Sequence, residues 1–295
     1  MTSTKIVRLL IHRDMRLTNY DDIIATMLPN VVATVPGEAA LIDKVAPHID
    51  AAEAEMINNI IGGEVVDRLC TDESLSALRA TAARYALASA LLTALPALDV
   101  VLTPNGFGVV STNNIAPASS ARMEALKASI IDRRDQAFEA LITALPTLAE
   151  WREQAVSRYY TATIFRALTL VDMVYQPDDK RCRIDRYKTL RAAADAEQQH
   201  LADIAISPEL MQRLCLATAT AEATAAENVL IERIKKIIAL DVAGVKYNKR
   251  EAVYDTVNYI KAHAADFPEW AASDVAALYN PPVFVNDRNS GGYFF

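Results

Sequence analysis

The spacing in this sequence that most suggests chemistry is Glu197-Gln-Gln-His200, which would place a carboxylate and an imidazole on one face of a helix. Helical di-iron proteins use this pair, but they need it twice, with two further glutamates facing it. The remaining histidines, His12, His48 and His263, have no glutamate three positions before them. We therefore expect a solvated polar helix face here, with no metal and no cofactor. A helical metal-binding enzyme using Glu197 and His200 is the alternative.

Two glycine-containing stretches superficially resemble nucleotide-binding loops. Gly62-Gly63-Glu64 lacks the lysine and the serine or threonine of a phosphate-binding loop. The stretch NGFG at 105–108 lacks the third glycine of a dinucleotide fingerprint. We expect a helix end at the first stretch and no cofactor at either.

The three cysteines, Cys70, Cys182 and Cys215, are too widely spaced for a zinc site or a disulfide framework. This usage indicates buried free thiols in a protein of cytoplasmic origin. An activated pair of a cysteine and a histidine is possible, but nothing in the sequence supports it, because sequence does not show which residues lie close together.

Composition describes a globular helical protein. The chain has 295 residues, 52% of them hydrophobic and 23% charged, with only 8 glycines and 12 prolines. Its formal net charge of -7 argues against a protein that coats nucleic acid, although DNA could pass it without binding. There is no run of about 18 apolar residues, so we expect no membrane span.

Apolar residues at three- and four-residue steps predict a mainly α protein. Helices are expected over 17–28, over 38–61 with a break or restart at Pro47, from 75 to Pro96, and from Ser119 or Ser120 to Pro146. Further helices are expected over about 184–203, 207–239 and 249–265, with a loop over 176–183.

One segment, 98–112, departs from the helical pattern. Val100–Leu102 and Val109–Val110 flank Asn105-Gly106, a turn pair suited to a two-residue β-hairpin. An isolated hairpin is marginally stable in water. It must therefore pack against the helices, pair with extended segments of the same chain, or pair with another chain.

The chain closes on an extended, turn-rich arm, 280–295, which contains Phe284, Tyr293, Phe294 and Phe295. Exposed aromatic side chains are costly, so we expect them to dock, either on the protein itself or on a neighbouring subunit. With Asn105, Gly106 and Phe107 of the hairpin, these four residues are the predicted subunit contacts.

The two halves of the sequence resemble each other. EVVDRLC at 64–70 matches ELMQRLC at 209–215, which is 145 positions later. The pattern E-W-x4-V-x3-Y-x3-[IV]-F occurs at 150–165 and again at 269–284, which is 119 positions later. Between them, Leu98-Asp99-Val100 matches Leu240-Asp241-Val242, so most of the missing length in the second copy follows this aspartate, where the first copy has the hairpin.

We therefore predict a degenerate internal duplication, with coincidental similarity as the alternative. The first helical module covers 1–175 and includes the hairpin 98–112, and the second covers 184–295 and includes the arm. If the duplication is real, Trp151 and Trp270 must occupy equivalent places in the two modules.

The block LDVVLTPNGFGVVSTNNIAPASSARMEAL at 98–126 resembles uncharacterised virion-type proteins of gut-bacterial phages and prophages, over roughly residues 80–151. More loosely, helical domains with an inserted hairpin and an extended arm resemble phage head–tail connector and adaptor proteins. The duplication departs from the single small module of those proteins, which puts the ring stoichiometry in doubt.

This resemblance implies a non-enzymatic virion protein, assembled in the cytoplasm of a bacterial host. It implies a connector subunit that forms a homo-oligomeric ring with portal and tail proteins as partners. DNA would pass the ring without sequence-specific binding, and no membrane would be involved. A tail-completion or capsid-associated protein is the structural alternative.

Overall fold

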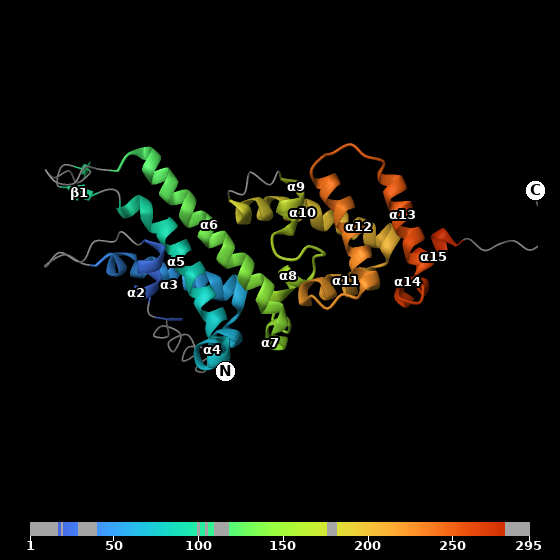
Figure 1. Cartoon of the computed structure of the whole chain (residues 1–295), viewed down its shortest axis with the longest axis horizontal. Coiled ribbons are helices and arrows are strands. Elements are labelled where there is room, and N and C mark those ends of the chain that lie inside the picture. Colours follow the sequence, from blue (N-terminus) through green and yellow to red (C-terminus); the bar gives the residue numbers. More distant parts are fainter. Residues whose placement is uncertain are drawn as a thin grey trace, which may run out of the picture. The chain divides into compact units, whose positions relative to one another are not determined.

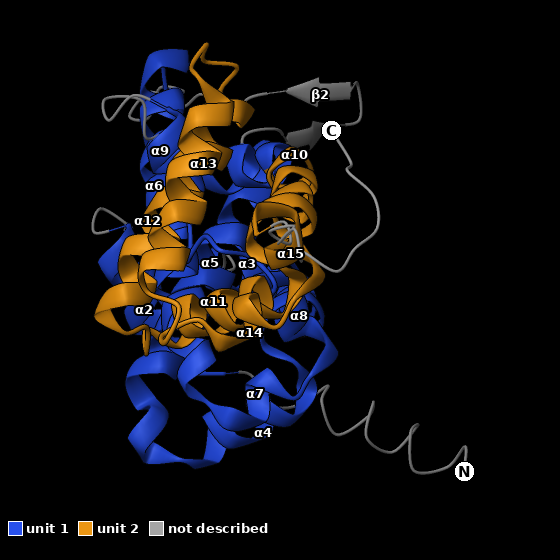
Figure 2. Ribbon diagram, turned by 90° about the vertical axis from the view of Figure 1, so that its right-hand side faces the viewer, with its two compact units in different colours: residues 1–190 blue, residues 191–295 orange. Residues whose placement is uncertain are grey.

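The computed structural model describes residues 17–18, 20–28, 40–98, 101–103, 106–108, 118–175 and 182–280, with only the backbone described at 101–103 and 106–108. The described chain is mainly helical, as predicted (Figure 1). It divides into two compact units, residues 1–190 and 191–295 (Figure 2). The boundary falls inside helix α10, later in the chain than the division between 175 and 184 that the sequence suggested.

Unit 1 is built from the following elements: α2 (Asp21–Met27), α3 (Leu41–Met56), η1 (Ile57–Ile61), α4 (Gly63–Thr71), η2 (Glu73–Leu75), α5 (Ser76–Leu98), β1 (Val101–Thr103), β2 (Gly106–Gly108), α6 (Ser120–Ala144), η3 (Leu145–Thr147), α7 (Ala149–Arg152), η4 (Ala155–Ser157), α8 (Arg158–Thr161), α9 (Thr169–Val174) and the start of α10 (Arg183–Leu201). Unit 2 contains the rest of α10, followed by η5 (Ala202–Ile206), α11 (Pro208–Thr220), α12 (Ala225–Val242), α13 (Lys249–Ala262), α14 (Pro268–Ala271) and α15 (Asp274–Tyr279).

Helix α5 is the centre of unit 1, with α3 and α6 packed against it. Its buried positions are mostly alanines, which allow neighbouring helices to approach closely: Ala82, Ala83, Ala86, Ala88, Ala90 and Ala94, together with Leu87 and Leu91. The helix from Glu73 to Leu98 is long and apolar enough to cross a membrane. A helix at the centre of a protein core meets the same criterion, so this is weak evidence for a span.

Three helix predictions are corrected. Pro47, expected at a break or restart, lies inside α3, and Pro96, expected at the end of a helix, lies inside α5. The single helix predicted over 207–239 is wrong, because Ala221 takes a left-handed conformation (φ 60°) that ends α11. Thr224 then starts α12 with a capping box, in which its hydroxyl accepts from the backbone N–H of Glu227 (3.2 Å) and the Glu227 carboxylate accepts from the N–H of Thr224 (2.8 Å).

Between α5 and α6, β1 pairs antiparallel with β2 in the register Val101↔Gly108, Leu102↔Phe107 and Thr103↔Gly106. Gly106, expected in the turn, therefore belongs to β2, and residues 104 and 105 lie between the strands. In unit 2 only the residues between Val242 and Lys249 separate α12 from α13. The second copy is thus shorter at the place that the sequence comparison indicated.

Each unit contains a π-helical turn, η1 or η5, with the same backbone geometry. The N–H of Gly62 donates to the carbonyl of Ile57 (2.7 Å), and the N–H of Ser207 donates to that of Ala202 (3.0 Å). Both donors have positive φ, 82° and 77°. A new helix starts after each of them, so the last carbonyls of the π-turn lack a donor within their own helix.

The two tryptophans supply such donors in equivalent places. Nε1 of Trp151 donates to the carbonyl of Ile60, and Nε1 of Trp270 donates to that of Ala205, both over 2.8 Å. The acceptors are 145 positions apart and the tryptophans 119, which are the two separations found in the sequence. Both indoles are buried. The tryptophans thus occupy matching positions, as the duplication requires.

In each π-turn the carbonyl one residue before the tryptophan's acceptor also receives a side-chain hydrogen bond, from a tyrosine. The hydroxyl of Tyr160 donates to the carbonyl of Asn59 (3.2 Å), and the hydroxyl of Tyr279 donates to that of Ile204 (2.9 Å). The separations are again 119 and 145 positions. Each π-turn is therefore held by a matched pair of side-chain donors.

An ion pair recurs as well. Nη1 of Arg68 lies 2.6 Å from Oε1 of Glu150, and Nη1 of Arg213 lies 3.3 Å from Oε1 of Glu269. These residues belong to the two sequence blocks that first indicated the repeat. The same arginine and glutamate therefore occur in both copies because they form a contact that joins the two blocks within each module.

Candidate functional site

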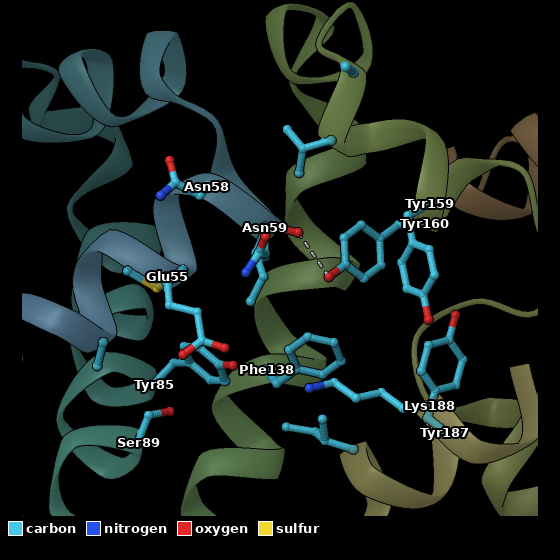
Figure 3. A pocket seen from close by; sticks show the side chains of 16 residues that line it. Glu55, Asn58, Asn59, Tyr85, Ser89, Phe138, Tyr159, Tyr160, Tyr187 and Lys188 are labelled. Carbon is cyan, nitrogen blue, oxygen red and sulfur yellow. Dashed lines mark hydrogen bonds between the residues drawn. The ribbon is translucent and has the colours of Figure 1, made fainter. Parts of the chain in front are cut away.

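Unit 1 contains a cavity of about 440 Å³ with aromatic walls, which we call the tyrosine cavity (Figure 3). A volume of this size lies within the range of binding pockets. The residues that line it are Ala52, Glu55, Met56, Asn58, Asn59, Ile60, Tyr85, Ser89, Phe138, Ala155, Val156, Tyr159, Tyr160, Ile184, Tyr187 and Lys188.

Several helices place these side chains around one space. Tyr85 and Ser89 stand one turn apart on α5 and therefore share a face. Phe138 comes from the buried face of α6. The η1 turn and α8 form a second side, and the first two turns of α10 bring Tyr187 and Lys188 to a third.

The aromatic walls form a connected series of ring contacts. The rings of Tyr85 and Phe138 lie 5.9 Å apart, and those of Phe138 and Tyr160 lie 6.1 Å apart. Tyr159 packs edge to face on Tyr160 (5.0 Å) and on Tyr187 (6.4 Å). These separations are those of favourable aromatic pairs. The contacts therefore join α5, α6, α8 and the start of α10.

Polar groups surround the mouth of the cavity. Glu55 and Lys188 are exposed and reach it from α3 and α10 (Figure 3). Burial raises the pKa of Tyr85, and the charge of Glu55 adds to this against the opposing charge of Arg134. The phenol of Tyr85 thus stays protonated at neutral pH, as a hydrogen-bond donor.

The side chains around the tyrosine cavity are mainly aromatic, with a few charged and polar groups. Within the described part of the chain, no group of three or more histidine, cysteine, aspartate or glutamate side chains could hold a metal ion. Glu55 and Lys188 provide one charge of each sign, and the walls provide aromatic surface. Such a site suits an apolar side chain or helix end flanked by charge.

The predicted contact residues are not brought together by the described structure. Asn105, Phe284, Tyr293, Phe294 and Phe295 lie outside the described residues, as does the rest of the arm 281–295. For Gly106 and Phe107 only the backbone of β2 is described. Their role in subunit contact therefore stays a prediction.

Glu197 and His200 have different surroundings. His200 is exposed, whereas Glu197 is largely buried, with Oε1 2.7 Å from Nζ of Lys249. Lys249 also pairs with Asp241 (3.2 Å). Burial disfavours the ammonium of Lys249, but its hydrogen bonds to the two carboxylates outweigh this and raise its pKa. The expectation of a wholly solvated polar face is thus wrong at Glu197, which is ion-paired.

The prediction of buried free thiols is correct in part. All three cysteines are free, but only Cys215 is buried, and Cys70 and Cys182 are partly exposed. Burial raises the pKa of Cys215 to about 12, so this thiol is inert at neutral pH.

The tyrosine cavity itself was missed from sequence. From sequence alone, the basic–aromatic stretches at 158–160 and 187–188 indicate core tyrosines with outward-pointing hydroxyls. The sequence does single out one residue of this cavity, Tyr160, because it belongs to the repeated pattern. Repetition could indicate that this position is structurally fixed, but not that α5, α6 and α10 meet around it.

Comparison with known proteins gives one match. Residues 35–161 match a family of unknown function, DUF6712. No curated protein and no solved structure matches the chain. The matched range ends on the last residue of α8, so it covers the first module from α3 to α8. The second module lies outside the match, yet it repeats the contacts of the tryptophan, the tyrosine and the ion pair.

Proposed function

We propose that the protein is a non-enzymatic structural subunit of a phage virion, a head–tail connector that forms a ring with further copies of itself around the path of the DNA. Portal and tail proteins would be its neighbours. The proposal starts from the resemblance of residues 80–151 to virion-type proteins and from the acidic net charge of -7, which suits DNA that slides without binding.

The observation that supports it most is a difference in length between the two modules. Helix α6 has 25 residues and its counterpart α13 has 14. At about 1.5 Å per residue, α6 is about 37 Å long and α13 about 21 Å. The second module buries Val253, Val257 and Ile260 on α13 without this extra length, and Figure 1 shows α13 as the shorter helix. The extension of α6 therefore serves something other than the module's own core.

The surface of the extension fits a contact role. No residue over 120–129 is buried, and the first buried residue of α6 is Ile130. Met123 and Leu126, three positions apart on one face, are only half-buried. In the sequence this extension follows the β1–β2 segment, which ends at Gly108. Apolar side chains on a projecting element are suited to a neighbouring subunit.

Native mass spectrometry and particle imaging of the purified chain test the proposal. We expect discrete oligomers, and co-purification with phage heads or tails when the virion genes are expressed together. Met123→Asp with Leu126→Asp should reduce assembly, whereas Ala125→Asp, an exposed position on the same helix, should not. A chain that stays monomeric at every concentration and joins neither heads nor tails would refute the proposal.

A further inference from the structure

We propose that the aromatic residues of the arm, Tyr293, Phe294 and Phe295, dock in an open groove between α12 and α13 of the same chain. The inference goes beyond the proposed function and does not depend on it, because it concerns a contact within one chain. The equivalent surface of unit 1, on which a helix of that unit lies, supports it.

The groove, which we call the α12–α13 groove, belongs to unit 2 alone. Helices α12 and α13 pack side by side (Figure 2), and the groove has a volume of about 780 Å³. Among the described residues, its lining comes only from these two helices and from Tyr247 in the link between them. Val229 on its α12 side is 44% exposed. The described part of unit 2 therefore leaves this groove open.

In unit 1, helix α2 lies on the equivalent surface. It packs against α5 and buries Ile24 and Met27. From α6, Nη1 of Arg133 donates to the carbonyl of Thr26 near the end of α2 (3.3 Å). Helix α2 is therefore held against both α5 and α6, which are the counterparts of α12 and α13 in the first module.

The two surfaces share three positions on their second helix. Three residues of α6 line the space beside α2, and the residues 119 positions later line the α12–α13 groove. They are Arg133, Gln136 and Ala137 on α6, and Ala252, Asp255 and Thr256 on α13. A helix therefore lies in unit 1 at the place where unit 2 has the groove.

Exposure shows the same difference on the first helix. Between Leu78 and Leu92 of α5, only Arg84 is exposed. Over the shorter stretch 228–236, α12 exposes five residues: Asn228, Val229, Glu232, Arg233 and Lys236. The surface is thus covered on α5 and uncovered on α12 by the described residues.

The helix that the repeat would place on this groove is bound elsewhere. Helix α9 precedes α10 as α2 precedes α3. Arg183, however, joins Asp172 of α9 (2.6 Å) to Glu139 of α6 (2.6 Å), all within unit 1. The second module therefore needs another segment to cover its groove.

The repeat indicates where the arm runs. Phe284 matches Phe165, so the arm corresponds to the segment that follows α8 and contains α9. That segment returns along α6, because Nη2 of Arg166 donates to the carbonyl of Thr143 (3.3 Å) and the shared arginine ties α9 to Glu139. We therefore expect the arm to return along α13.

This course along α13 leads to the groove. The counterparts of Thr143 and Glu139, 119 positions later, are Ala262 and Asn258. Asp255, which lines the groove, lies one turn before Asn258. The α13 side of the groove is within about 15 Å of position 262, and the arm over 281–295 can extend over about 50 Å. The arm is therefore long enough to reach the groove of its own chain.

The attachment of the arm favours the same chain over a second copy. Nζ of Lys261, near the end of α13, donates to the carbonyl of Tyr279 (2.7 Å), so the arm starts beside this helix. A short flexible tether holds its ligand at an effective concentration on the order of mM. A second copy would have to compete with that concentration.

The groove suits aromatic side chains. Ile237 is buried at its base, and the hydroxyl of Tyr247 donates to the carbonyl of Ile237 (3.1 Å), which holds the tyrosine ring in place. Arg233 and Lys236 provide exposed cations, which bind favourably over aromatic faces. Three aromatic residues in a row are costly to leave in water. Docking here removes that cost.

Hydroxyl-radical footprinting of the full-length chain, read residue by residue by mass spectrometry, tests the inference. In the parent, the three aromatic residues of the arm should be oxidised more slowly than in a free peptide of residues 281–295. Val229→Asp places a charge in the groove and should raise their oxidation rate about tenfold, toward that of the peptide. Leu216→Asp, at a 48% exposed position outside the groove, should leave the rate unchanged.

The reciprocal variant is read in the groove itself. Phe294→Ser/Phe295→Ser should raise the oxidation rates of Val229 and Tyr247, whereas Asn289→Ser, also in the arm, should not. Because these substitutions fall on the arm or on an exposed position, each chain should remain folded, which circular dichroism checks.

Each outcome supports or overturns the inference. If the arm's aromatic residues are oxidised in the parent as fast as in the peptide, they are not docked. Protection that Val229→Asp leaves unchanged places them on another surface, and either result overturns the inference. Protection that is lost on about hundredfold dilution means that a second copy supplies the arm, which overturns the assignment to the same chain. Equal protection at both concentrations supports it.

Discussion

Gly62 and Ser207 have nearly the same backbone conformation, with φ/ψ of 82°/147° and 77°/145°. This region is essentially restricted to glycine, because a Cβ atom collides there with the residue's own backbone. One copy of the repeat has the suitable residue and the other does not. Exchanging the residue types should therefore change stability in opposite directions, Ser207→Gly stabilising unit 2 and Gly62→Ser destabilising unit 1.

The magnitude for Ser207→Gly follows from three effects. Relief of the backbone strain is worth about 1–3 kcal/mol. The serine hydroxyl accepts from the N–H of Leu210 over 3.3 Å, and replacing such a cap by glycine loses a few tenths of a kcal/mol. The greater freedom of glycine in the unfolded chain opposes the gain by about 0.5–1 kcal/mol. The net effect is a stabilisation of about 1 kcal/mol.

Gly62→Ser meets an additional steric conflict. A Cβ atom at Gly62 would lie 1.6 Å from Oε1 of Gln154, so that side chain must move. The matching position in the second copy is Ser273, whose side chain is shorter. We expect Gly62→Ser to cost about 1–2 kcal/mol from strain and displacement. Adding Gln154→Ser to Gly62→Ser should restore part of the lost stability, with a coupling free energy between the two substitutions of about 0.5–1 kcal/mol.

Urea unfolding followed by fluorescence measures both changes. The chain has two tryptophans, Trp151 in unit 1 and Trp270 in unit 2, each bonded to the π-turn under test. If Ser207→Gly and Gly62→Ser change the free energy of unfolding by nearly equal amounts of the same sign, the strain argument is refuted. Destabilisation by Ser207→Gly would show that its cap outweighs the strain, and the absence of coupling with Gln154→Ser would refute the steric part.

Three further outcomes are expected. Trp151→Phe and Trp270→Phe should each destabilise their unit by about 1–3 kcal/mol in urea unfolding, because a buried carbonyl loses its donor; a loss in only one unit would contradict their equivalence. Burial raises the pKa of Cys215 from its usual 9.0 to about 12, so the buried thiol contributes stability that is full below pH 9 and lost as pH rises toward 12. The parent should therefore lose more stability than Cys215→Ala over that window, and equal losses would count against the burial. Metal analysis should find no stoichiometric iron or manganese, since Glu197 is paired with Lys249; metal that is lost in His200→Ala would overturn this.

The helical class and the repeat could be predicted because both depend on local signals. Three- and four-residue periodicity indicates helices whatever their partners are. The repeated blocks remained recognisable because their residues bond to each other: Arg68 with Glu150, and Trp151 with a carbonyl of η1. A contact that both copies need restricts both copies to similar residues.

Helix boundaries and the tyrosine cavity could not be predicted, for different physical reasons. The end of α11 depends on one alanine, Ala221, adopting a left-handed conformation, which its residue type does not indicate. The cavity depends on α5, α6, α8 and α10 meeting, and tyrosine spacing along the chain does not encode that meeting. Pro47 indicates a helix boundary by its residue type, whereas α3 continues through it.

The repeat also separates structural from functional residues. Residues that keep both their type and their contact in the two modules, such as Trp151 and Trp270, are explained by the shared fold. Positions that keep their place but change their type need another cause. Tyr159, 45% exposed, is matched by Leu278, 70% exposed, and the extension of α6 has no counterpart in α13. Because the module folds with either residue type and with either length of this helix, its fold requires neither. The cause of these differences must therefore lie in what each copy contacts. The differences between the copies are therefore the first places to look for subunit contacts.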